Sequence, residues 1–160
     1  MLNFSVWVDA DSFPVKARDF LVSHALSKDV QVKFVANHEI KSPNPKVGMI
    51  VCQKEHDAAD NYIFEHVLEN DIVVTRDILF AARLVEKKIV VMNDRGVIFT
   101  KFNIEDKLRE REFSLNMAEI GLGGGKNNYY GEKELKKFSS TFTEELQKHV
   151  IADIYNVKRL

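Results

Sequence analysis

The feature that most constrains the fold is a regular alternation of short β-rich runs with longer segments of helical periodicity. Such alternation is typical of βα units arranged around a parallel sheet. Because crossovers between parallel strands are right-handed, the helices must cover both faces of one sheet. We therefore expect an α/β three-layer sandwich with a mainly parallel, five-stranded sheet. The predicted strands are Phe4–Val8, Val30–Ala36, Val47–Cys52, Ile72–Thr75 and Ile89–Met92.

Five further segments have apolar residues at helical spacing. These predicted helices are Pro14–Leu26, Ala58–Leu68, Ile78–Val85, Ile104–Arg111 and Glu132–Val150. Pro14 suits the first turn of a helix, and Asn103 is the predicted cap of the fourth helix. Gly121–Gly131 is rich in glycine and asparagine and predicts a loop. No repeat or linker divides the sequence, so we expect one domain over residues 1–160.

Composition excludes several classes of protein. The 23 basic side chains nearly balance the 24 acidic ones, so the chain lacks the basic excess of proteins that bind nucleic acid by charge alone. A nucleic-acid partner must then be engaged locally, through metal ions. The single cysteine, Cys52, cannot form an internal disulfide, and no apolar run is long enough to span a bilayer. We expect a cytoplasmic protein without a signal peptide or a membrane partner.

Aspartates follow three of the predicted strands. Asp9 and Asp11 come after the first strand, Asp57 and Asp60 after the third, and Asp77 after the fourth. In open α/β sheets, ligands bind outside the carboxyl ends of the strands, near the point where strand order reverses. If the first and fourth strands are neighbours, these carboxylates share one rim. Oxygen ligands of this kind suit Mg²⁺ or Mn²⁺.

A purely structural interpretation competes with the metal site, because aspartate is a favoured helix N-cap. Asp57 and Asp60 have the spacing of a capping box, Asp77 can cap the third helix, and Asp11 or Ser12 can cap the first. Asp9 differs, since it ends a buried strand where no cap is needed. Crowded carboxylates also cost free energy unless a cation offsets their charge. The cluster as a whole therefore favours a metal, although no single member does.

Several stretches carry a resemblance to a known family. They are VDADSFPVK (Val8–Lys16), VAN (Val35–Asn37), DAADNYI (Asp57–Ile63), DIVVTRDILFAARLVEKK (Asp71–Lys88) and NDRGVIFTKFNI (Asn93–Ile104). They resemble the bacterial YaiI/YqxD family, an uncharacterised group classed with PIN-like domains, over nearly the whole chain. The family usually has Ala-Cys where Ser12 and Phe13 stand, so a thiol there cannot be essential. Gly125 stands where the family tends to have proline.

The resemblance implies a PIN-like fold with a Mg²⁺ or Mn²⁺ site of the kind used by nucleases. The positions that match are Asp9, Asp11, Asp57, Asp60 and Asp77. Our hypothesis is a metal-dependent phosphodiesterase acting on RNA, or on DNA, in which Asp9, Asp60 and Asp77 are catalytic metal ligands. Asp11 and Asp57 then either support the metal ligands from behind or bind a second metal ion. The supporting residues are Thr75, Arg76, Ser12 and Lys16.

Two alternatives stay open. The chain can be a non-catalytic PIN-like module that binds RNA or protein, with the aspartates kept as helix caps. Asp9-Ala10-Asp11 also resembles the acid pair of haloacid-dehalogenase-like phosphatases, but a later acidic doublet and a matched lysine are missing. The Gly123–Lys126 run is not a P-loop, because its spacing fails and no strand precedes it. The arginines that could hold phosphates are Arg76, Arg83, Arg95, Arg109 and Arg111.

Overall fold

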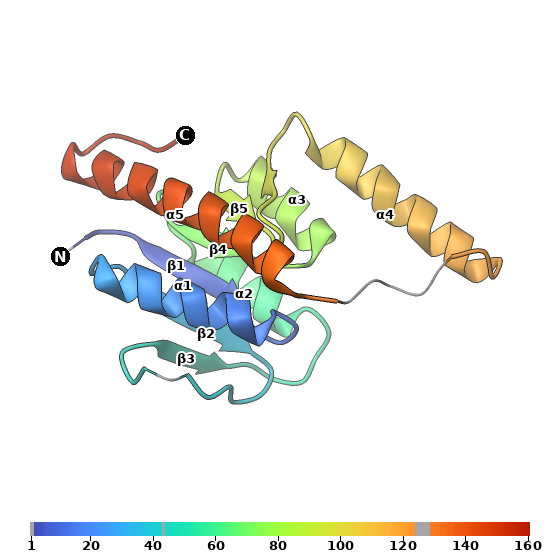
Figure 1. Ribbon diagram of the computed structural model, residues 1–160, viewed down its shortest axis with the longest axis horizontal. Coiled ribbons are helices and arrows are strands. Elements are labelled where there is room, and N and C mark those ends of the chain that lie inside the picture. The colour runs from blue at the N-terminus through green and yellow to red at the C-terminus, as the bar shows by residue number, and fades with distance from the viewer. Residues whose placement is uncertain (1, 43, 124–128) are drawn as a thin grey trace.

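The computed structural model describes residues 2–42, 44–123 and 129–160 and contains one six-stranded sheet in the order β3-β2-β1-β4-β5-β6 (Figure 1). The strands are β1 (Ser5–Asp9), β2 (Gln31–Ala36), β3 (Gly48–Val51), β4 (Ile72–Val74), β5 (Val90–Met92) and β6 (Ile98–Phe99). The first five are mutually parallel, and β6 runs antiparallel to β5. The predicted α/β class and the mainly parallel sheet are therefore confirmed.

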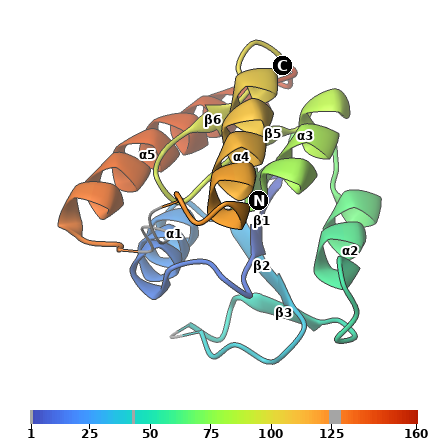
Figure 2. The same ribbon diagram turned by 90° about the vertical axis from the view of Figure 1, so that its right-hand side faces the viewer.

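Helices cover both faces of the sheet. They are α1 (Val15–Ser27), α2 (Ala58–His66), α3 (Ile78–Glu86), α4 (Ile104–Glu119) and α5 (Glu132–Ile154). Figure 2 shows α1 and α5 on one side of the sheet and α2 and α3 on the other, which gives the expected three layers. Helix α4 packs beside α3 and then runs outward from the body of the domain (Figure 1). No helix of the described part combines the length and apolar character needed to cross a membrane.

The core consists of two apolar clusters, one on each face of the sheet. Val6 and Val8 point to the cluster beneath α1 and α5, while Trp7 points to the cluster beneath α2 and α3. Side chains of a strand alternate between faces, and a central parallel strand is buried on both. This explains why the strands read as continuous apolar runs rather than as alternating patterns.

The strand order reverses between β1 and β4, and this reversal defines the place for a ligand. From β1 the chain crosses to β2 and β3 on one side, and β4 then returns to pair with β1 on its other side. The carboxyl ends of β1 and β4 consequently lie next to each other, with Val8 opposite Val74. A crevice at this position is the usual ligand site of open α/β sheets.

Three local differences from the predictions have physical explanations. Strand β6 was not predicted, because two residues carry no detectable periodicity. Helix α4 extends beyond Arg111 to Glu119, since its outer residues have good helix propensity but no core beneath them to impose an apolar pattern. Gly121, with φ of +75°, follows its end. Helix α5 likewise continues from the predicted Val150 to Ile154.

The prediction that the side chain of Asn103 caps α4 is wrong. Asn103 occupies the position before α4, but its side chain makes no hydrogen bond to the amides of that helix. Its Oδ1 instead accepts from the backbone N–H of Thr100, and its Nδ2 donates to the carbonyl of Ile98. It therefore fastens the turn between β6 and α4. The Gly125 position, like most of the Gly123–Lys126 run, lies outside the described residues.

Candidate functional site

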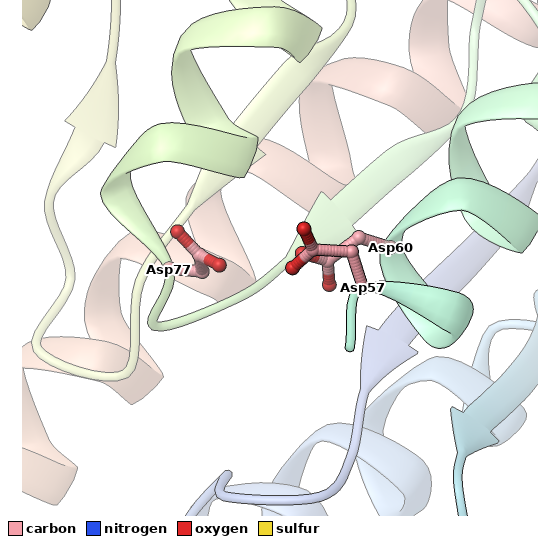
Figure 3. Close-up of side chains that lie close together, drawn as sticks. All are labelled: Asp57, Asp60 and Asp77. Atoms are coloured by element: carbon pink, nitrogen blue, oxygen red, sulfur yellow. The ribbon is translucent and has the colours of Figure 1, made fainter. Parts of the chain in front are cut away.

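Three aspartates converge at the carboxyl edge of the sheet. One carboxylate oxygen from each of Asp57, Asp60 and Asp77 lies within 4.8 Å of the other two. Asp57 and Asp60 come from the start of α2, and Asp77 from the start of α3. Figure 3 shows the first two facing the third across a short gap. Two helices that begin at the same sheet edge thus bring acids from separate βα units together.

Asp77 serves both as a helix cap and as a member of the cluster. Its Oδ1 accepts hydrogen bonds from the backbone N–H groups of Leu79 at 2.9 Å and Phe80 at 3.2 Å. These bonds confirm that Asp77 caps α3. Both helix amides use this one oxygen, and a side-chain hydrogen bond also links Asp77 to Asp60. Capping by the helix amides uses only Oδ1, so the cap does not prevent the carboxylate from facing Asp60 or a metal ion, and the two interpretations are compatible here.

The side chain of Asp57 does not cap α2, so the predicted capping box of Asp57 and Asp60 is wrong. It precedes α2 with a φ of 64°, and its side chain makes no hydrogen bond to the helix amides. Its Oδ1 lies 3.3 Å from Nε2 of the exposed His56. The left-handed backbone is tolerated better by Asp than by most residues, but it still carries strain. This conformation places the carboxylate next to Asp60 rather than over the end of α2.

Asp60 is the buried member of the cluster, with 9% of its surface exposed. No N–H group and no hydroxyl of the described residues donates to its carboxylate; its side-chain hydrogen bonds are shared with the carboxyl groups of Asp77 and Asp9. Burial raises the pKa of Asp60 to about 8, and the charges of Asp9 and Asp77 act in the same direction. A buried carboxylate without a donor needs a proton or a cation to offset its charge.

Asp9 adjoins this trio at the end of β1. Its Oδ2 accepts a hydrogen bond of 2.8 Å from Oγ1 of Thr75, which directly follows β4 and is fully buried. The same Oγ1 accepts from the backbone N–H of Asp77 at 3.1 Å. Burial raises the pKa of Asp9 to about 6; the Thr75 hydrogen bond lowers it, and the charges of Asp11 and Asp77 raise it. Thr75 thus connects two acids of the site.

Asp11 turns to the opposite side of β1. Its oxygens accept from the backbone N–H of Asn37 at 2.9 and 3.2 Å, and His38 Nδ1 lies 3.3 Å from Oδ1. The predicted cap of α1 by Asp11 or Ser12 is wrong, because no side chain caps that helix. Asp11 instead fastens the loop after β2, and its charge raises the pKa of Asp9.

The predicted supporting residues divide into two groups. Arg76 donates through Nη1 to the backbone carbonyl of Ser12 at 3.1 Å, and its Nε lies 3.4 Å from Oδ2 of Asp94. Arg76 therefore ties the loops after β1, β4 and β5 together, with Ser12 contributing its carbonyl. Lys16 is exposed in the first turn of α1 and makes no ion pair with the described residues.

Two features of the site were missed or only vaguely indicated by the sequence. Asp94, which is 3% exposed, follows β5 and could have been found by the same strand-end rule. The acidic trio also lines a cavity of about 430 Å³ together with basic side chains from α3, α4 and two loops. These side chains are His56, Arg76, Arg83 and Arg111. Arg83 and Arg111 were named only as two of several arginines, because no local pattern marks them.

Comparisons with known proteins agree on a family. Residues 7–148 match the model of a family described as uncharacterised, the YaiI/YqxD family. A UPF0178 protein of Treponema denticola is 42% identical over 144 residues, covering 89% of this chain and 92% of its own length. A UPF0178 protein of Psychromonas ingrahamii is 35% identical over 145 residues, covering 90% and 96%. No solved structure matches the chain significantly.

Proposed function

The chain belongs to the YaiI/YqxD family, and we propose from its acidic site that it is a divalent-metal-dependent nuclease that hydrolyses phosphodiester bonds. RNA is the expected substrate, ahead of DNA. The observation that carries the proposal is the buried carboxylate of Asp60, which lies between Asp57 and Asp77 and has only other carboxylates as its side-chain partners among the described residues. Such crowded carboxylates need a shared proton or a hard cation to offset their charge, and a divalent ion can replace the proton.

The residues present fit a Mg²⁺ or Mn²⁺ ion in their chemistry. Asp57, Asp60 and Asp77 offer carboxylate oxygens close to one another, and such oxygens are the ligands these ions prefer. Asp9, fixed by Thr75, stands beside them as a further ligand or as the acceptor for a water molecule. When bound, the ion would activate a water molecule and stabilise the charge that develops on the phosphate oxygens.

The other residues hold these groups in place. Thr75 donates to Asp9 and accepts from the amide of Asp77, so one hydroxyl positions two acids. Asp11 and Arg76 fasten the loops on which Asp9 and Asp77 lie. The phosphatase alternative needs Asp9 and Asp11 to act on one substrate, yet they bond to opposite sides of β1. Their divergence favours the nuclease proposal over the phosphatase.

The test is cleavage of labelled single-stranded RNA and DNA by the purified protein. We expect cleavage in Mn²⁺ or Mg²⁺ that EDTA stops, and loss of at least about 100-fold in Asp9→Asn and Asp60→Asn, since each removes a charge at the metal. The exposed Asp19→Asn is the matched control and should retain activity. Cleavage that survives in Asp60→Asn would reveal a contaminating nuclease. Metal binding without cleavage of any RNA or DNA would favour the non-catalytic module.

A further inference from the structure

The cavity of the acidic site carries two guanidinium groups that its acids do not neutralise. Arg83 of α3 and Arg111 of α4 line it together with Asp57, Asp60 and Asp77. In the described part of the chain neither arginine forms an ion pair with any acid. Opposite charges that share a cavity without touching leave room between them for a ligand. Such a ligand must present a cationic side to the acids and an anionic side to the arginines.

Arg83 is held in place by its neighbours. Its Nη1 donates to Oδ1 of Asn61 at 3.1 Å, and its guanidinium lies 4.3 Å from the ring centroid of Phe64. Stacking on an aromatic face and one hydrogen bond fix the plane of the group. A guanidinium has five N–H donors, so several are left for a ligand after this single bond.

Arg111 reaches the cavity through the packing of α4 on α3. The first turns of α4 are anchored by the buried Ile104 and by Leu108, and Arg111 follows Leu108 on the same helical face. Arg111 is half-buried and makes no ion pair or side-chain hydrogen bond with the described residues. By contrast Arg109, on another face of the helix, is exposed and pairs with Asp106.

We propose that Arg83 and Arg111 form a clamp for a phosphate group of the substrate, an inference that rests on the proposed function. Arginine binds phosphate oxygens through two parallel N–H bonds, which makes it the suitable residue type. The nearby carboxylates repel a phosphate on its own, so the group enters with the cation that the acids hold. A volume of about 430 Å³ is within the range of small-molecule sites. The ligand class is a phosphate ester bound together with a divalent ion.

The test measures the binding of adenosine 5′-monophosphate by calorimetry in saturating Mn²⁺, with adenosine as the probe that lacks phosphate. We expect the wild type to bind the monophosphate at least tenfold more tightly than adenosine. Arg111→Ala and Arg83→Ala should each weaken monophosphate binding by about tenfold, as expected when charge-assisted hydrogen bonds are lost. Arg109→Ala is the matched control on the same helix and should bind like the wild type. Arg111→Lys keeps the positive charge but lacks the planar pair of N–H donors of a guanidinium, and it should give an intermediate affinity.

Mn²⁺ binding separates this inference from the proposed function. Removal of a cationic side chain near the acids should leave Mn²⁺ affinity unchanged or slightly higher in Arg111→Ala. If the wild type binds Mn²⁺ but does not prefer the monophosphate, or if both alanine variants stay within twofold of wild type, the clamp is wrong and the metal site stands. If the wild type binds no Mn²⁺ while the arginine variants still lose the monophosphate, the arginines hold phosphate without a metal ion, so both the metal-linked ligand class and the nuclease proposal are wrong. Thermal melting of each variant confirms that it is folded.

Discussion

Replacement of Asp60 by asparagine should stabilise the metal-free protein in a way that depends on pH. The pKa of Asp60 rises from 3.8 to about 8 in the folded protein, chiefly through burial and also through the charges of Asp9 and Asp77. A raised carboxyl pKa means that folding favours the protonated form. The free energy of unfolding should therefore fall as pH rises from about 4 and level off near pH 8. Asparagine has no charge to bury and does not lose this stability.

The size of the effect follows from the pKa change. One pKa unit corresponds to about 1.4 kcal/mol, so a rise of about four units sets a ceiling near 6 kcal/mol. Asp57 is half-exposed, so water enters the cavity on its side. This water screens part of the repulsion between the carboxylates around Asp60. We therefore expect Asp60→Asn to be more stable than wild type by about 2–4 kcal/mol at pH 8.5. The two proteins should be equally stable near pH 4.

Urea unfolding in EDTA at pH 4, 6, 7 and 8.5 measures this difference directly. Asp19→Asn, an exposed aspartate of α1, is the control and should follow the wild type at every pH. A variant that is less stable than wild type at pH 8.5 would refute the reasoning, because Asp60 would then make a stabilising contact as a carboxylate. A stability difference that does not change with pH would refute the assignment of the effect to its charge.

Three further outcomes follow from the same contacts. Mn²⁺ should raise the melting temperature of wild type in proportion to the logarithm of its concentration above saturation, but not that of Asp60→Asn. Asp77→Asn should keep the hydrogen bonds that cap α3, whereas Asp77→Ala should lose them. The free energy of unfolding in urea should therefore be about 1 kcal/mol lower for the alanine variant than for the asparagine variant, and equal stabilities would mean that the cap is unimportant. Arg159→Ala should cost about 2–4 kcal/mol, because it removes the bonds of 2.6 and 2.9 Å to the 2%-exposed Glu145. Lys158→Ala breaks an exposed ion pair with Glu69 and should cost less than Arg159→Ala, and equal losses would contradict this ranking.

The sequence predicted most of the fold because the main strands are buried on both faces. Such strands appear as apolar runs, and strand Ile72–Val74 needs no tertiary information to be recognised. The same reasoning fails for the outer half of α4. Phe113 is 65% exposed and Ile120 equally so, which means that no core selects the residues there. Without a buried face the end of the helix has no periodic signal, and only Gly121 marks it.

The acidic site could be located because strand ends of a parallel sheet share an edge. That rule brought Asp9, Asp60 and Asp77 to one rim without any knowledge of side-chain contacts. It placed Asp57 on this rim only as a supporting group or a ligand of a second metal, because the left-handed backbone that turns Asp57 toward Asp60 is a property of the folded loop rather than of its composition. Arg111 could not be assigned to the site, since the packing of α4 on α3, more than twenty residues away in sequence, brings it to the cavity.

The sequence could not decide whether each aspartate is a helix cap or a metal ligand, and the contacts in the structure differ from one aspartate to the next. Asp77 caps α3 with Oδ1 alone while its carboxyl group also faces Asp60, so its structural role does not compete with a ligand. Asp57 and Asp60 make no cap bonds, although their spacing is that of a capping box. Helix α2 therefore begins without the side-chain cap that its sequence offers, at a cost of about 1 kcal/mol. Two carboxylates turned from helix amides toward other carboxylates are hard to explain by stability alone, and this is why we regard the acids as a functional site.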